Sequence, residues 1–329
     1  MNIRSKTYRG RSDIHNPLET PVTKTDGRMV RYLKTNTIIG FHGHSIYDVG
    51  KYFLNSLFRE NLTIRASSLS FNFFLSLFPI LIFLLTLIAY LPIKGLKSGL
   101  INEIHLLLPE TSSKALSDTI YELLNQQHST LLSFGFLLAL YFASNAYHTM
   151  INTFNRRLPQ RIRRHWVHNR LLAIGLTFLI TFYGILTLLF VSKFYQAETY
   201  IHKHHWFAEP VLAWIMVLLE YIVLMLFVLI SISSVYYYAP ATKHRWRFFS
   251  AGSILATILS ILSTLLFSLY VNNFNSYNKV YGSIGAIIAL MVLIYINTLV
   301  ILVGFDLNTS IEKAAMTAKL REGRKNNKG

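Results

Sequence analysis

The sequence predicts an all-α polytopic membrane protein: six transmembrane helices, an N-terminal interfacial helix and short periplasmic amphipathic helices. The chain has 329 residues, of which 52% are hydrophobic and only 14% charged, whereas soluble domains carry roughly 25% charged residues. Its apolar residues also form long runs, and about 20 residues of helix cross a hydrocarbon core of about 30 Å. These runs are continuous rather than alternating, which favours helices over a β-barrel.

The predicted spans are residues 69–91, 130–151, 171–191, 211–235, 248–271 and 284–305. Twenty-six of the 32 lysines and arginines lie before the first span, in the second and fourth connections, or after the last span. This positive-inside bias predicts a multi-pass protein of the bacterial inner membrane with both termini in the cytoplasm. It also explains the net charge of +17 without a nucleic-acid partner.

Three parts follow from this layout: a basic cytoplasmic arm at 1–44, a membrane domain at 45–311 and a basic cytoplasmic tail at 312–329. The arm has no apolar periodicity and no signal-peptide pattern. Apolar residues then recur at helical spacing from Ser45, which can cap a helix together with Asp48. That amphipathic helix either lies flat on the membrane interface or packs against the cytoplasmic ends of the bundle.

Polar residues inside the predicted spans are the first candidates for function. Asn72 precedes Pro79 in the first span, where the proline favours a kink, and Asn145 lies in the second span. Glu220 lies about ten residues into the fourth span, where a charge costs about 2.5–3.5 kcal/mol, so we expect it to be protonated or to have a partner inside the bundle. These residues either bond neighbouring helices or line a polar path.

The connections offer further candidates. Residues 92–128 predict two short amphipathic helices on the periplasmic face, which form a lid, a lipid anchor or a docking surface for a partner. The second connection is rich in arginine and predicts a site for anionic lipid headgroups, with a phosphate-bearing ligand as the sharper alternative. Its candidate residues are Arg156, Arg157, Arg161, Arg163 and Arg164. The chain has no cysteine, and the loop histidines 202–205 lack an accompanying carboxylate motif, so we predict no metal site and no cofactor.

Several motifs carry a resemblance to a known family. They are the run Leu266–Gly285, the closing Gly304-Phe-Asp-Leu-Asn308, Ser76-Leu-Phe-Pro79, and Tyr238-Ala-Pro240 with Trp246. Over residues 45–311 the sequence resembles the YihY/BrkB family of bacterial inner-membrane proteins. Asp306 stands where that family has glutamate. The resemblance adds Asp306 and Asn308 to the candidates and implies an old ribonuclease label. Because Asp306 lies at the cytoplasmic end of the sixth predicted span, we expect its carboxylate to reach the membrane interface at a low cost in free energy.

The segment between the last two spans is unusually rich in amides and phenols. We expect it to be non-helical and to dip into the bundle, because polar backbone at membrane depth must be buried or line a cavity. There its side chains would bond Asn72, Asn145 or Glu220. It adds the candidates Asn272, Asn275, Tyr277, Asn278, Lys279, Tyr281 and Gly282.

These features favour a non-enzymatic transporter of a lipid or another amphipathic anion in envelope maintenance, with membrane lipids as partners. A membrane scaffold for envelope biogenesis, docking a periplasmic partner through 92–128 or forming a homo-oligomer, is the alternative. A ribonuclease is less well supported, because the acids are scattered and metal-assisted phosphodiester cleavage needs clustered ligands.

Overall fold

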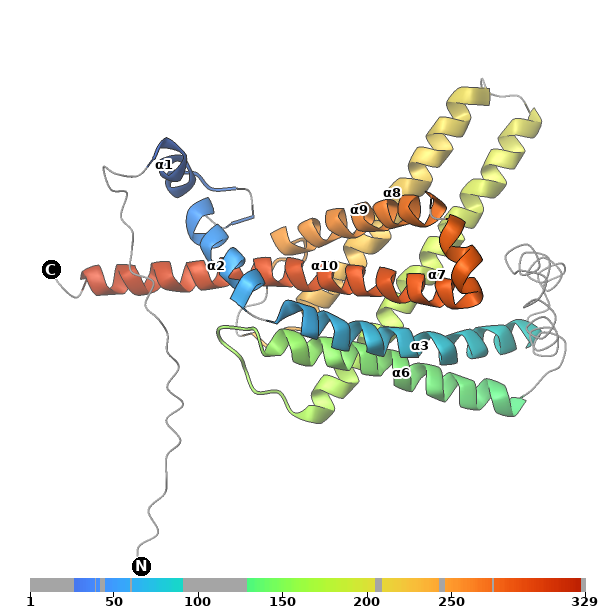
Figure 1. The fold of residues 1–329 in the computed structure, drawn as a ribbon, viewed down its shortest axis with the longest axis horizontal. Helices are drawn as coiled ribbons and strands as arrows, with labels where there is room; N and C mark the ends of the chain where they lie inside the picture. The colour runs from blue at the N-terminus through green and yellow to red at the C-terminus, as the bar shows by residue number, and fades with distance from the viewer. Residues whose placement is uncertain are drawn as a thin grey trace, which may run out of the picture.

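The structure, a computed structural model, describes residues 27–38, 40–41, 45–59, 61–90, 129–204, 209–242, 246–273 and 275–326. All regular structure in these ranges is α-helical (Figure 1). The helices are α1 Arg28–Thr35, α2 Ile46–Arg59, α3 Leu62–Tyr90, α6 Ser129–Asn155, α7 Trp166–His204, α8 Glu209–Tyr238, α9 Ala251–Asn273 and α10 Asn275–Asn326.

The predicted fold class is confirmed. Among the described residues, α3, α6, α7, α8, α9 and α10 are each long and apolar enough to cross a membrane. Two of them are much longer than predicted, since α7 has 39 residues and α10 has 52. The predicted amphipathic helices of 92–128 lie outside the described residues.

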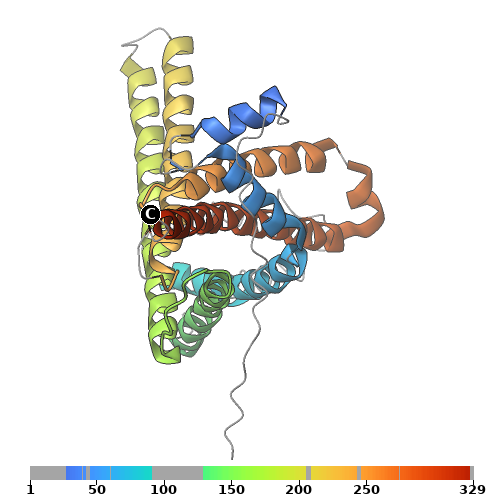
Figure 2. The same cartoon turned by 90° about the vertical axis from the view of Figure 1, so that its left-hand side faces the viewer.

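The spanning helices form two groups. Helices α3, α6 and α10 run side by side along the long axis, with α9 next to α10 (Figure 1). Helices α7 and α8 form a hairpin that is steeply inclined to this group (Figure 2). We call one end of the bundle the basic end; α2, the start of α3 and the segments 156–165, 239–242 and 246–250 meet there.

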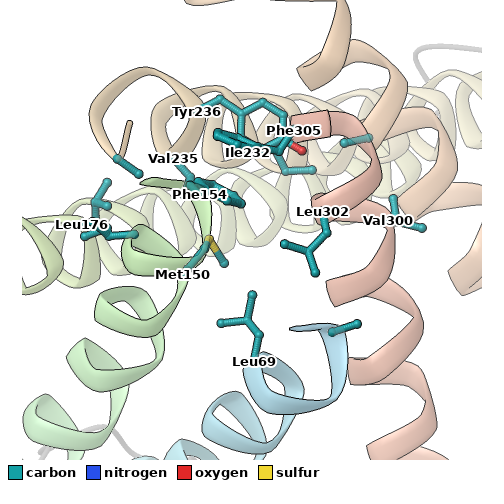
Figure 3. Packing of buried hydrophobic residues seen from close by; sticks show 14 of the residues in the cluster. Leu69, Met150, Phe154, Leu176, Ile232, Val235, Tyr236, Val300, Leu302 and Phe305 are labelled. Carbon is teal, nitrogen blue, oxygen red and sulfur yellow. The ribbon is translucent and has the colours of Figure 1, made fainter. Parts of the chain in front are cut away.

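The apolar core of the bundle lies near the basic end. Phe154 of α6 stacks on Phe305 of α10 with ring centroids 3.8 Å apart and planes 7° from parallel. Tyr236 of α8 meets Phe305 edge-on at 5.9 Å. Leu69 and Leu302 are also fully buried there (Figure 3). This cluster therefore fastens the inclined α7–α8 hairpin to the parallel group.

Helices α9 and α10 cross in close contact at two glycines. A Cβ atom on Gly304 would lie 2.5 Å from the Gly252 carbonyl oxygen and 2.7 Å from the Tyr236 hydroxyl. A Cβ on Gly252 would lie 2.6 Å from Oδ1 of Asn308. Such small-residue contacts let two membrane helices approach closely enough for dispersion forces to hold them.

The helix predicted from Ser45 is present, and the predicted Ser45 cap is confirmed, with the Asp48 side chain bonded to it. The Ser45 hydroxyl accepts a hydrogen bond from the Asp48 backbone N–H at 3.1 Å and donates to the Asp48 carboxylate at 2.9 Å. Of the two positions considered for this helix, the structure shows the one packed against the bundle. Val49 is buried against Leu307, Ile311 and Ala314 of α10, and the Tyr52 and Thr317 hydroxyls are hydrogen-bonded at 3.0 Å.

The arm contains a short helix, α1, that was not predicted from the sequence; residues 1–26 lie outside the described ranges. One prediction about local structure, the non-helical segment between the last two spans, is wrong. The segment between the last two spans is helical on both sides of residue 274, because α9 continues to Asn273 and α10 begins at Asn275. A helix satisfies the backbone within lipid, and this segment has no proline to interrupt one. Its side chains lie outside the description.

Candidate functional site

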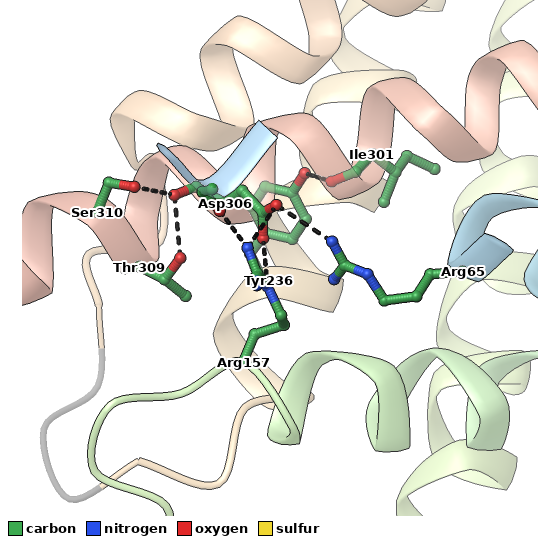
Figure 4. Close-up of polar contacts among 8 residues, drawn as sticks. Arg65, Arg157, Tyr236, Ile301, Asp306, Thr309 and Ser310 are labelled. Carbon is green, nitrogen blue, oxygen red and sulfur yellow. Dashed lines mark hydrogen bonds and ion pairs between the residues drawn. The ribbon is translucent and has the colours of Figure 1, made fainter. Parts of the chain in front are cut away.

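A buried ion-pair cluster centres on Asp306 of α10, which has no exposed surface. Arg157, just after α6, holds both carboxylate oxygens, with Nε to Oδ1 at 3.1 Å and Nη2 to Oδ2 at 2.9 Å. Arg65 of α3 reaches Oδ2 through Nη2 at 3.3 Å (Figure 4). The predictions that Asp306 reaches the interface and that Arg157 binds headgroups are therefore wrong. Because α10 continues to Asn326, Asp306 lies within the helix and is covered by neighbouring elements.

Other elements complete this cluster, which we call the Asp306 cluster. Nη2 of Arg157 also donates to the Ser56 hydroxyl of α2. The Thr309 and Ser310 hydroxyls donate to the Asp306 carbonyl at 2.9 and 2.6 Å. Lys313 lies one turn further and interacts electrostatically with both Arg157 and Asp306. Four parts of the chain thus meet at one carboxylate.

A second polar group links three spanning helices. Asn145 of α6 donates from Nδ2 to Oδ1 of Asn72 on α3 at 2.9 Å. Arg170 of α7 lies 3.5 Å from Oδ1 of Asn145 and stacks over the ring of Tyr141, 4.9 Å from its centroid. The first three of these side chains are half-buried. We call Asn72, Asn145 and Arg170 the amide ladder.

Helix α3 connects the ladder with the Asp306 cluster. Arg65 and Asn72 are seven residues apart, so they lie on one face about 10 Å apart along the axis. Pro79 follows after another seven residues, and the helix continues through it. One face of α3 therefore carries the guanidinium, the amide and the proline from the basic end inward.

Comparison with known proteins shows which family the chain is part of. The family described as "Virulence factor BrkB" matches residues 54–329. The chain belongs to the BrkB family. It is 32% identical over 249 residues to the ribonuclease-like protein YfkH of Bacillus subtilis (strain 168), covering 76% of this chain and 90% of that protein. No solved structure matches the chain.

The closing motif of this BrkB-family protein, 304–308, now has a structural explanation. Gly304 permits the contact with α9, Phe305 stacks in the core, and Asp306 holds the arginines. Asn308 accepts a hydrogen bond from the Gly252 N–H at 2.8 Å and donates to the Ser250 hydroxyl at 2.8 Å. Asn308 thus joins the start of α9 to α10, and its buried side chain is placed there rather than on the amide ladder.

Glu220 does not lie beside the other candidate residues whose side chains the structure describes. Its side chain is exposed on α8, so among the described residues it has no partner inside the bundle, which was one of its two expectations. Since α8 belongs to the inclined hairpin, one side of it is left uncovered by the other described helices. The candidates of 272–282 lie in helix ends whose side chains fall outside the description.

The basic connection 156–165 divides into two kinds of arginine. Arg164 bonds the carbonyl oxygens that follow α8, with Nη2 to Pro240 at 2.7 Å and Nη1 to Ala239 at 3.1 Å. It therefore joins two connections instead of facing headgroups, contrary to its prediction. Arg156, Arg161 and Arg163 are exposed at the basic end, and their headgroup role stays a prediction.

Sequence reasoning missed the roles of three residues. Arg65 and Arg170 were counted only among the basic residues that set the topology. Trp246 was noted as part of a family motif, and in the structure its Nε1 donates to Glu312 at 3.3 Å. The available signal was the position of each arginine within the first turns of a spanning helix, where its side chain can reach back along the bundle. Within the described residues, no group of three or more His, Asp or Glu side chains gathers as metal ligands would.

Proposed function

We propose that this BrkB-family protein is a non-enzymatic transporter that moves an amphipathic anion, such as an anionic lipid, across the inner membrane. The amide ladder is the observation that carries the proposal. Polar and ionisable side chains within spanning helices are costly and characteristically mark substrate pathways. Asn72, Asn145 and Arg170 are only half-buried, so a passing headgroup can exchange hydrogen bonds with them.

The distribution of charge supports an anionic cargo. The positive-inside bias supports a cytoplasmic basic end, where Arg156, Arg161 and Arg163 are exposed. Each basic residue near a membrane surface attracts anionic lipid by about 1 kcal/mol. The cargo would gather at these arginines and then meet Arg170, the cationic end of the ladder.

The acid of the closing motif offers little to a nuclease. Metal-assisted phosphodiester cleavage uses carboxylates as metal ligands, whereas both oxygens of Asp306 are engaged by Arg157. The name of the Bacillus subtilis relative contains the word ribonuclease-like, so the activity is worth measuring. RNA cleavage by nuclease-free purified protein, abolished in Asp306→Asn, would argue for that function instead.

The transport proposal is tested in liposomes with a fluorescent phosphatidylglycerol and an impermeant quencher. We expect the wild-type protein to make the inner-leaflet lipid accessible faster than empty liposomes do. Asn72→Leu and Asn145→Leu keep the branched shape and the number of heavy atoms of the side chain but remove the ladder's hydrogen bonds. We expect each to slow the movement at least about tenfold, the effect of 1.4 kcal/mol on a barrier.

Asn297→Leu is the matched control. Asn297 is an amide inside α10 that is bonded to Ser260 of α9, away from the ladder. We expect it to keep wild-type flux. Equal loss in all three variants would show that amides act only through helix packing. Absence of flux in the wild type would favour the scaffold, which needs no path through the bundle.

A further inference from the structure

Arg65 is bound less completely than its neighbour in the Asp306 cluster. Among the described residues its guanidinium makes one hydrogen bond, the 3.3 Å contact from Nη2 to Asp306, while Nη1 is buried without a hydrogen-bond partner there. A guanidinium carries five N–H donors, and a buried donor without a partner costs free energy. The position of Arg65 beside Asp306 therefore costs free energy, because one of its buried N–H groups has no acceptor within the described part of the chain.

Asp306 does not depend on Arg65. Arg157 already holds both of its oxygens in a bidentate pair at 3.1 and 2.9 Å, the stronger geometry for arginine and carboxylate. The Arg157 side chain is 5% exposed, whereas that of Arg65 is 19% exposed. Arg65 can thus leave the carboxylate without stranding a buried charge.

We propose that Arg65 is an anion-binding residue that leaves Asp306 to take a phosphate group at the basic end of the bundle. The inference rests on the proposed function for its physiological meaning and names the anion and its point of entry. A phosphate monoester or a phospholipid phosphodiester presents two oxygens to the planar guanidinium, which binds such groups through two hydrogen bonds.

The position of Arg65 fits this ligand. It lies in the first turn of α3, where the helix dipole favours an anion and disfavours an unpaired cation. The same face of α3 leads after two turns to Asn72 and the amide ladder. A phosphate held by Arg65 would therefore stand at the start of the path proposed above.

Binding is measured as the thermal stability of the full chain. One arm, in neutral detergent, titrates inorganic phosphate against chloride at equal ionic strength. The other arm compares the protein in nanodiscs of phosphatidylcholine with and without phosphatidylglycerol. We expect at least one of these anions to raise the Tm of the wild type by about 3–5 °C near saturation, as ligand linkage predicts for a chain of this size. A rise in the first arm alone indicates free phosphate, and a rise in the second alone indicates the lipid; both support the site.

Two variants and one control decide whether Arg65 is responsible. Arg65→Gln should lose the rise, and Arg65→Lys, which keeps the charge without the fork, should need at least about tenfold more ligand. Arg247→Gln, at another exposed basic-end position that has no part in the proposed path, should respond like the wild type. Should Arg65→Gln fail to fold, the lysine variant still decides.

The proposal is overturned by an unchanged rise in Arg65→Gln or Arg65→Lys, or by no rise in the wild type with either anion. The liposome assay separates this failure from that of the transport proposal. Flux that depends on Asn72 and Asn145 while no anion stabilises the protein would reject only the site at Arg65.

Discussion

At the scale of single residues, Gly304 sets how closely α9 and α10 approach. Gly304→Ala would place a methyl group 2.5 Å from a backbone oxygen and 2.7 Å from the Tyr236 hydroxyl, and a backbone oxygen cannot give way as a flexible side chain can. Overpacking of this kind costs about 1–3 kcal/mol or more. We expect a lower Tm in detergent, measured by thermal unfolding, and the same for Gly252→Ala.

Gly175→Ala is the matched control for this prediction. Gly175 lies in α7, and a Cβ there meets no atom within 4 Å. We expect its Tm to equal or exceed the wild-type value, since alanine favours a helix by up to about 1 kcal/mol relative to glycine. Equal destabilisation by Gly175→Ala and Gly304→Ala would contradict a special role for the α9–α10 contact.

Residue-level prediction from sequence succeeded where the partners are near in the chain. The Ser45 cap, which involves Asp48 three positions later, was predicted. Asp306 and Arg157 are separated by 149 positions, and nothing in the local pattern says which arginine meets which acid. The polar character of Asn72 and Asn145 was visible, but their mutual bond across 73 positions follows only from the packing of α3 on α6.

At the scale of elements, the contact between α2 and α10 is the least expected. Hydropathy located the part of α10 that crosses the membrane but ended it at 305, because the residues that follow are more polar. In the structure those residues continue the helix and bury Val49 of α2 against Leu307, Ile311 and Ala314. An amphipathic helix has one apolar face, and the sequence alone does not say whether lipid or protein covers it.

A cross-link tests this contact, and the chain is suited to it because it has no native cysteine. We expect the double variant Tyr52→Cys with Thr317→Cys to be joined by a short bis-maleimide in native membranes, since the two hydroxyls are 3.0 Å apart. The pair Asn55→Cys with Thr317→Cys serves as control, because Asn55 is exposed on α2. Failure of the first pair, or equal yield from both, would indicate that α2 lies on the membrane away from α10.

At the scale of the whole molecule, the inclination of the α7–α8 hairpin escapes any prediction from sequence. The 39 residues of α7 are about 58 Å long as a helix, well beyond a hydrocarbon core of about 30 Å. Excess length permits tilt but does not set its angle, which depends on packing against neighbours. Here the ring cluster of Phe154, Tyr236 and Phe305 fastens the hairpin near the basic end and leaves its other end apart from the parallel helices (Figure 1).

The orientation of the whole bundle follows from charge and is open to a direct test. Basic residues gather at one end, and the positive-inside rule predicts that this end faces the cytoplasm because lysine and arginine resist translocation. Single-cysteine variants at Ser129, where α6 begins at the opposite end, and at exposed Arg161 report the two sides. In intact cells with a permeabilised outer envelope, we expect an impermeant maleimide to label Ser129→Cys at once and Arg161→Cys only after the membrane is disrupted. The reverse order would turn the bundle over, and Arg65 and the amide ladder would then open toward the outside, so that any anion they bind would come from the periplasmic leaflet.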